Sequence, residues 1–171
     1  MAHSKLARPS KERKALLRGQ ASTLLWNGFM ETTETKAKEV KAYAEKIITL
    51  AVNSYKDVVK VTKTRVGDKG EQVKMEVLND GPKKLAARRK IMTMCYDLQE
   101  QRKDKEAKDA FIERTKDIKH PLIEKIFNVY APRYAERAEK LGQGGGYITM
   151  VKLGKRRGDN ADMARLELIA E

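Results

Sequence analysis

An α+β fold is predicted by two features of the sequence: short segments of alternating residues near the C-terminus, and longer apolar stripes at helical spacing before them. The alternating segments are residues 147–153 and 163–169, and residues 29–33 are a further short strand candidate. They predict a small sheet of about three strands packed on three to four helices. Residues 1–9 are predicted to form a basic tail in front of a single domain, residues 10–171.

The two C-terminal strand segments are connected by a basic loop. Alternation places Ile148 and Met150 on one face of the first strand, and Ala164 and Leu166 on one face of the second. The loop between them carries three adjacent cations, Lys155, Arg156 and Arg157. Like charges gathered at a sharp bend favour binding of an anion.

The N-terminal segment is strongly basic and leads into the first helix. Residues 1–18 contain six Lys and Arg residues and His3 against the single acid Glu12. Ser10 is the predicted N-cap after Pro9, and Gly28 is predicted to end the helix. A second helix is predicted after the strand at 29–33, with Thr33 as its cap and an apolar stripe that includes Val40, Ala44 and Ile47.

Two insertions interrupt this arrangement. Residues 53–80 alternate on both sides of a glycine-containing turn at 67–70 and predict a β-hairpin that stands away from the core. Residues 99–119 mix acidic and basic side chains with few apolar ones, and the sequence leaves open whether they form an irregular insertion or a solvated helix. Helices are predicted to begin at Pro82 and Pro121, the latter ending at Ala131–Pro132.

The composition indicates a polyanionic partner. The chain has 171 residues, a net charge of +13 and an isoelectric point of about 9.8. Nucleic acid is the first candidate and an anionic membrane surface the second. Cys95 is the only cysteine, so the sequence predicts neither an internal disulfide nor a Cys/His zinc site. No signal peptide or bilayer-spanning run is evident, which predicts a cytoplasmic location.

Several motifs, taken in order along the chain, resemble one family. They are Arg13-Lys14-Ala15-Leu16-Leu17-Arg18, Glu31-Thr32-Thr33-Glu34, Ala87-Arg88-Arg89, Ala131-Pro132-Arg133-Tyr134 and Arg156-Arg157-Gly158-Asp159. Together they resemble bacterial large-subunit ribosomal protein seventeen. Ala7 departs from that family's pattern, in which glycine is expected, and Ile148-Thr149 stands where Thr-Arg is common.

The resemblance implies a structural protein of the large ribosomal subunit that binds ribosomal RNA near the polypeptide exit region, not an enzyme. Its expected partners are this RNA and neighbouring large-subunit proteins, with no membrane, small-molecule substrate or cofactor. The basic patches and matched motifs select the expected RNA-binding residues: His3, Lys5, Arg8, Lys11, Arg13, Lys14, Arg18, Lys36, Lys38, Arg88, Arg89, Arg133, Tyr134, Lys155, Arg156 and Arg157.

Two alternative functions remain open from the residues alone. One is a non-ribosomal architectural protein that binds nucleic acid or a membrane surface. The other is a nuclease that would hold a metal with Asp159, Asp162 and Glu167, but their spacing matches no ligand signature and Arg165 would neutralise the site. The glycine-rich run at 142–146 lacks the residues of a phosphate-binding loop and predicts a tight entry into a strand.

Overall fold

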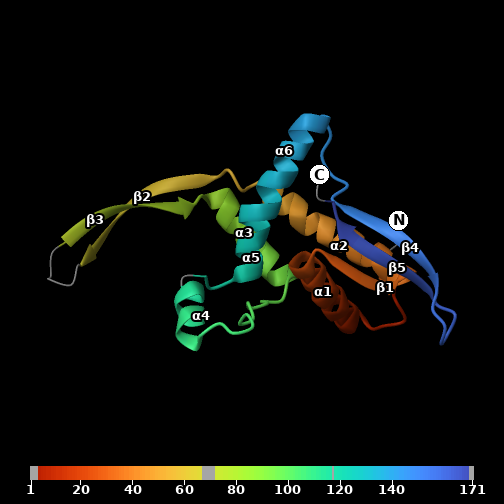
Figure 1. Cartoon of the computed structure of the whole chain (residues 1–171). Helices are drawn as coiled ribbons and strands as arrows, with labels where there is room; N and C mark the ends of the chain where they lie inside the picture. The colour runs from red at the N-terminus through yellow and green to blue at the C-terminus, as the bar shows by residue number, and fades with distance from the viewer. Residues whose placement is uncertain (1–3, 67–71, 117, 170–171) are drawn as a thin grey trace.

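The computed structural model describes residues 4–66, 72–116 and 118–169 and confirms the α+β class. Helix α2 (Glu34–Val52) lies at the centre, and helices α1 (Ser10–Asn27), α3 (Pro82–Met94) and α6 (Ala131–Leu141) and a three-stranded sheet all pack against it (Figure 1). Its stripe is completely buried, including Val40, Ala44 and Ile47. Each such Val or Ile contributes about 1.5–3 kcal/mol of burial free energy, which makes α2 the main organiser of the core.

The caps of α1 and α2 follow from backbone geometry. Gly28 ends α1 in the left-handed conformation, as predicted, with φ 86°. The predicted N-cap of α1 was wrong by one residue: Pro9 holds the cap position, because its ring keeps it extended just outside the helix while its carbonyl accepts the Arg13 N–H at 2.9 Å. Thr33 holds the N-cap position of α2, but its side chain makes no capping hydrogen bond.

The three-stranded sheet has the predicted strands in the order β1 (Phe29–Thr33), β5 (Asp162–Leu168) and β4 (Ile148–Lys155), all antiparallel. Met150 lies opposite Leu166, and both belong to the face that covers α2. The alternation of β4 breaks after Lys152, where one extra residue forms a bulge and Gly154 adopts φ 87°. The bulge bends β4 as it enters the basic loop.

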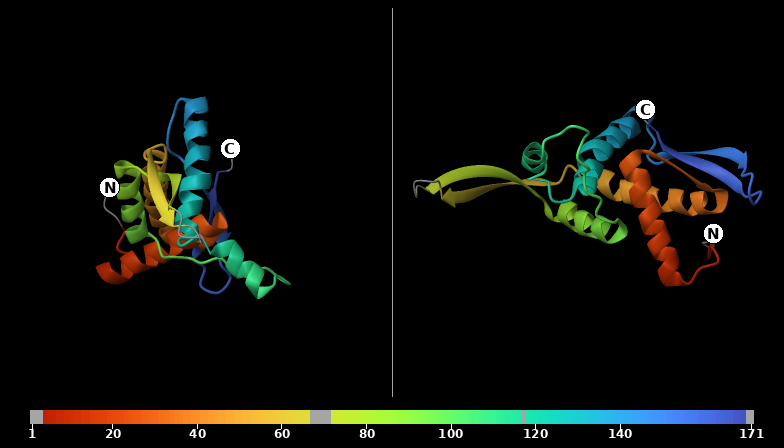
Figure 2. Two further views of the ribbon diagram at one scale, coloured as in Figure 1. Left: turned by 90° about the vertical axis from the view of Figure 1, so that its left-hand side faces the viewer. Right: turned by 60° about the horizontal axis from the view of Figure 1, so that its bottom comes forward.

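The predicted hairpin in the first insertion is confirmed. Strands β2 (Val58–Val66) and β3 (Gln72–Asp80) pair antiparallel over their whole length in a separate two-stranded sheet that projects away from the body of the protein (Figures 1 and 2). The predicted turn at 67–70 lies outside the described residues. The second insertion contains both of the alternatives left open by the sequence, because a short exposed helix α4 (Lys108–Thr115) follows an irregular stretch.

The helix that begins at Pro121 does not end at Ala131–Pro132, so that prediction was wrong. Helix α5 (Pro121–Lys125) passes through a π-helical turn η1 (Ile126–Tyr130) into α6, which continues to Leu141. The wider π turn lies directly before Pro132, where the proline ring and its missing N–H would otherwise disrupt the i to i−4 ladder. The continuous rod buries Leu122, Ile126 and Tyr130 against the core.

Candidate nucleic-acid interface

The N-terminal tail, from Ser4 on, is folded back onto α2. The backbone N–H of Ser4 donates to the Glu39 carboxylate at 2.9 Å, and Arg13 donates to the Ser4 carbonyl at 3.3 Å. Ala7 has φ 50°, in the left-handed region that favours glycine, so the departure from the family pattern at this residue falls where glycine would relieve backbone strain. These contacts fix the path of the tail toward α1.

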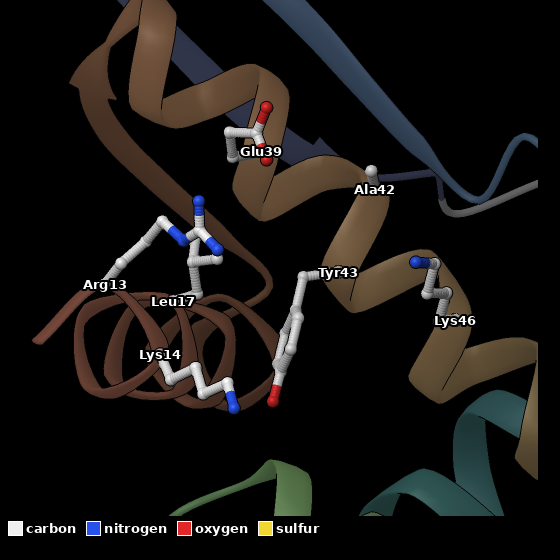
Figure 3. Close-up of a pocket in the computed structure, with 7 residues that line it drawn as sticks. All are labelled: Arg13, Lys14, Leu17, Glu39, Ala42, Tyr43 and Lys46. Carbon is white, nitrogen blue, oxygen red and sulfur yellow. The ribbon is translucent and has the colours of Figure 1, made fainter. Parts of the chain in front are cut away.

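A pocket of about 160 Å³ lies between α1 and α2 beside this tail. Figure 3 shows its lining: Arg13, Lys14, Leu17, Glu39, Ala42, Tyr43 and Lys46. Three of these side chains are cationic, and Glu39 is the only acid among them. Lys46 is exposed and was not predicted as a site residue. In the sequence it follows Tyr43 by three residues on the second helix, and this spacing places the two side chains on the same face of a helix.

The tail and the first turns of α1 carry further exposed cations. Lys5, Lys11 and Lys14 have no ion-pair partner among the described residues, and Arg8 makes a single long contact, 3.8 Å, with Glu12. Such an exposed pair contributes little, because water screens it. The cationic charge of the tail and the first turns of α1 is therefore available to an anion.

The start of α2 and the sheet add cations to the same end of the molecule. Glu34 lies between Lys38, at 2.8 Å, and Lys152, at 3.2 Å, and hydrogen bonds from both lysines lower the pKa of its carboxyl. One acid thus faces two cations, which leaves a net positive charge. Lys36, on the same turn, is half-buried.

The basic loop between β4 and β5 is held by one of its own cations. Arg156 binds the Asp159 carboxylate with two nitrogens, at 3.0 and 2.5 Å, and its backbone N–H donates to the Ala161 carbonyl at 2.9 Å. Lys155 and Arg157 flank this closed turn, are exposed, and have no ion-pair partner among the described residues. Arg156 therefore shapes the loop, and its two neighbours present the charge.

The tail and this loop lie toward the same end of the protein, opposite the β2–β3 hairpin (Figures 1 and 2). They come from opposite ends of the sequence and are brought together by the antiparallel pairing of β1 with β5. The structure thus assembles the tail, α1, the start of α2 and the loop into one cationic region, which we call the basic end. It is defined by Lys5, Arg8, Lys11, Lys14, Lys38, Lys155 and Arg157.

Three further predicted site residues, Arg18, Arg88 and Tyr134, have partners inside the fold. Arg18 donates to the carbonyls of Cys95, at 2.7 and 2.9 Å, and Met92, at 3.2 Å, and caps the C-terminus of α3. Arg88 lies between Asp80 and Glu124, both at 2.5 Å. Their guanidinium groups are occupied inside the fold, so neither belongs to the basic end.

Tyr134 is the third of these residues. Its side chain is buried, its ring lies 4.8 Å from that of Tyr147, and its hydroxyl lies within hydrogen-bond distance of the Tyr147 and Ile169 carbonyls. Burial raises the pKa of this hydroxyl to about 12. A ring enclosed in this way cannot stack on a base, so Tyr134 joins α6 to the end of the sheet.

The remaining predicted residues are placed as follows. Arg89 is exposed on α3, and Arg133 is exposed at the start of α6. His3 lies outside the described residues.

The acids considered for a metal site are dispersed or neutralised. Glu167 forms an ion pair with Arg165 at 2.6 Å, and Asp159 is bound to Arg156. Within the part of the chain that the structure describes, no cluster of three His, Cys, Asp or Glu side chains could hold a metal ion. In the same described ranges, none of the helices combines the length and apolar character needed to cross a bilayer.

Comparison with known proteins decides between the remaining possibilities. The model of the family described as ribosomal protein L17 matches residues 16–169. The chain belongs to the ribosomal protein L17 family. This family consists of structural proteins of the large ribosomal subunit, not of enzymes. The predicted family, the ribosomal location and the non-enzymatic role are therefore confirmed. The nuclease alternative is excluded.

The curated relatives agree over nearly their full lengths. The chain is 34% identical to large ribosomal subunit protein bL17 of Acetivibrio thermocellus, over 98% of this chain and 99% of that protein. It is 37% identical to the protein of the same name from Lachnospira eligens, over 98% of both chains, and 36% identical to that of Oenococcus oeni, over 99% of both. Both insertions fall within the range matched by the family model.

Proposed function

We propose that this L17-family protein binds ribosomal RNA in the large subunit through the basic end and holds separate RNA segments together. The observation that carries the proposal is the convergence of unpaired cations from the tail, α1 and the β4–β5 loop at one end of the fold. Lys and Arg side chains bind phosphate oxygens of any sequence, and each contact releases counterions. The protein would therefore recognise RNA mainly by its backbone and shape.

Different parts of the basic end are suited to different RNA segments. The tail and α1 contribute Lys5, Lys11 and Lys14, of which Lys14 lines the α1–α2 pocket, whereas Lys155 and Arg157 stand on a closed loop at the end of β4. These two groups of cations belong to different elements of the fold, the N-terminal helix and the β4–β5 hairpin. A single protein that contacts RNA at both would tie two segments together.

Salt dependence of RNA binding tests the proposal. The double variant Lys155→Ala, Arg157→Ala should flatten the slope of log affinity against log salt by about 0.7 to 0.9 for each lost phosphate contact, and equally for RNAs of different sequence. The matched control is Lys60→Ala, which removes an exposed cation from the hairpin at the opposite end and should leave the slope unchanged. An unchanged slope in the double variant would remove the loop from the interface.

The location near the polypeptide exit region rests on the resemblance of the motifs to the L17 family. A nascent chain stalled on ribosomes and carrying a photoreactive residue just outside the exit should cross-link to this protein. Cross-linking only to other proteins at every length of the nascent chain would contradict that location while leaving RNA binding intact.

A further inference from the structure

The β2–β3 hairpin is a feature that RNA binding at the basic end does not use. It is a two-stranded sheet separate from the three-stranded one, and it projects away from the other described elements (Figures 1 and 2). Isolated hairpins are marginally stable in water unless one face packs on something. The free faces of this hairpin are therefore places where a partner would stabilise it.

One face of the hairpin is aliphatic. Val61 lies opposite Val77, and Val59 and Met75 belong to the same face by the period-two rule. Val59, Val61 and Met75 are 46%, 37% and 47% exposed. The opposite face carries mainly Lys60, Thr62, Thr64 and Glu76, with Val58 and Leu78 close to the base. Burial of the aliphatic face on a partner would gain about 25 cal/mol for each Å² of apolar surface.

The charge of the hairpin argues against RNA as this partner. Residues 58–80 contain five Lys and Arg against four Asp and Glu, in a chain whose net charge is +13. Aliphatic side chains neither neutralise phosphate nor stack on bases. A nearly neutral arm with an aliphatic face is the composition of a protein interface.

Lys63 indicates the charge of that partner. It lies opposite Met75 on the aliphatic face, is exposed, and has no ion-pair partner among the described residues. A docked protein would bring an apolar patch against Val59, Val61 and Met75. It would also need an acidic side chain facing Lys63, because a lysine buried without a counter-charge is costly.

The base of the hairpin fixes the direction in which this face points. Asp80, at the end of β3, pairs with Lys84 at 2.9 Å and with Arg88, which also binds Glu124 of α5. The Arg88 guanidinium lies 5.1 Å from the Phe127 ring centre. A hairpin anchored in this way loses less conformational freedom on binding than a flexible loop would.

We propose that the β2–β3 hairpin is a docking arm for a second protein of the large subunit, which covers the face of Val59, Val61, Met75 and Val77 with an apolar patch and places a carboxylate opposite Lys63. The arm lies at the opposite end from the cations that would bind RNA. This protein would thus link RNA at one end to a neighbouring protein at the other.

Site-specific cross-linking in assembled ribosomes tests this docking arm. The full-length chain carrying p-benzoylphenylalanine in place of Met75 is incorporated into large subunits and irradiated, and the matched control carries it in place of Thr62 on the opposite face. A cross-link from position 75 to one other protein, absent from position 62, is expected. Cross-linking of position 75 to RNA, to a second copy of this chain or to nothing would overturn the proposal.

Substitutions in the hairpin test how it binds the protein that the cross-linking identifies. The pair Val61→Glu, Met75→Glu should weaken binding of the full-length chain to that protein at least tenfold, whereas Thr62→Glu, Thr64→Glu should leave it unchanged. All four side chains are exposed, so both variants should melt within about 2 °C of the parent. Lys63→Glu should weaken binding, and reversal of the facing acid should restore it. Equal losses in the two double variants would contradict a one-sided interface.

RNA binding measured on the same variants separates the two proposals. The Val61→Glu, Met75→Glu variant should keep the salt slope of the parent protein, since its changes lie away from the basic end. A loss of RNA affinity here with no loss of protein binding would make the hairpin an RNA-binding element and exclude the docking arm.

Discussion

The carboxylate of Asp57 accepts a hydrogen bond from the backbone N–H of Lys83, 2.8 Å away, and so caps α3 from the segment that leads into β2. The same oxygen lies 3.3 Å from the Lys84 N–H, and the Asp57 carbonyl accepts the Gly81 N–H at 2.9 Å. Gly81 leaves room for this contact: a Cβ there would lie 2.4 Å from the Asp57 carboxylate. The cap therefore joins the residue that precedes β2 to the residues that follow β3.

Loss of the cap should destabilise the protein. Gly81→Ala displaces the Asp57 carboxylate and Asp57→Ala removes it, so each should lower the free energy of unfolding by about 1 kcal/mol, as for other N-caps. Because both act on one interaction, the double variant should cost little more than either single one. Urea unfolding measures this, with Gly144→Ala, which faces open space, as the control. Fully additive losses would show that Gly81 does not act through Asp57.

Arg18 should contribute to stability and not to RNA binding. Arg18→Met removes a charged donor from the Cys95 and Met92 carbonyls and from its position 4.4 Å from the Tyr96 ring centre. We expect the free energy of unfolding to fall by about 1.5–3 kcal/mol. Lys11→Met, on the exposed side of the same helix, should change stability by less than about 0.5 kcal/mol but flatten the salt slope of RNA binding. The reverse pattern would place Arg18 in the RNA interface.

Cys95 should be nearly inert in the folded protein. Burial raises the pKa of its thiol to about 11, against smaller opposing effects of the Ser22 hydrogen bond and the Arg18 charge. At pH 8 only about one thiol in a thousand would be ionised, and the thiolate is the reactive form. Alkylation by iodoacetamide should therefore be at least a hundredfold slower in the native protein than in guanidinium chloride. Equal rates would mean that the thiol is accessible.

The same pKa shift sets a pH dependence of stability. The unfolded chain loses the thiol proton near the ordinary pKa of 9.0, whereas the folded chain keeps it to about 11. The stabilisation is thus fully present below pH 9 and is lost as the pH rises toward 11. In the Cys95→Ala variant, this part of the loss of stability at alkaline pH should be absent.

The strands could be predicted because their evidence is local. Alternation in β4 and β5 has a period of two, and glycines bound the first of these segments, so the sheet follows from neighbouring residues. The end of the helix at Pro132 could not be predicted in this way, because a proline is tolerated there only through the π turn before it. The cap of α3 was equally inaccessible, since Asp57 lies 26 residues before Lys83.

The basic patches could be predicted from composition, but not which cations are free. Arg88 and Arg157 look alike in sequence, each beside another arginine. In the fold, Arg88 is enclosed between Asp80 and Glu124, whereas Arg157 is exposed. That difference depends on which carboxylates, distant in sequence, lie beside each arginine in the fold. The order of charges along the chain does not give this information.

The Arg156–Asp159 pair should be visible in the titration of one carboxyl. Hydrogen bonds from Arg156, and from the Ala161 backbone N–H, lower the pKa of Asp159 from 3.8 to about 2. A depressed pKa means that the stabilisation of the loop is fully present above pH 3.8 and is lost as the pH falls through about 2. Carboxyl NMR of the full chain should give a midpoint near 2, and Arg156→Ala should move it back toward 3.8. Arg157→Ala, which leaves the pair intact, should not move it. A native midpoint near 3.8 would mean that the loop is open in solution, and Lys155 and Arg157 would then reach RNA without a preformed turn.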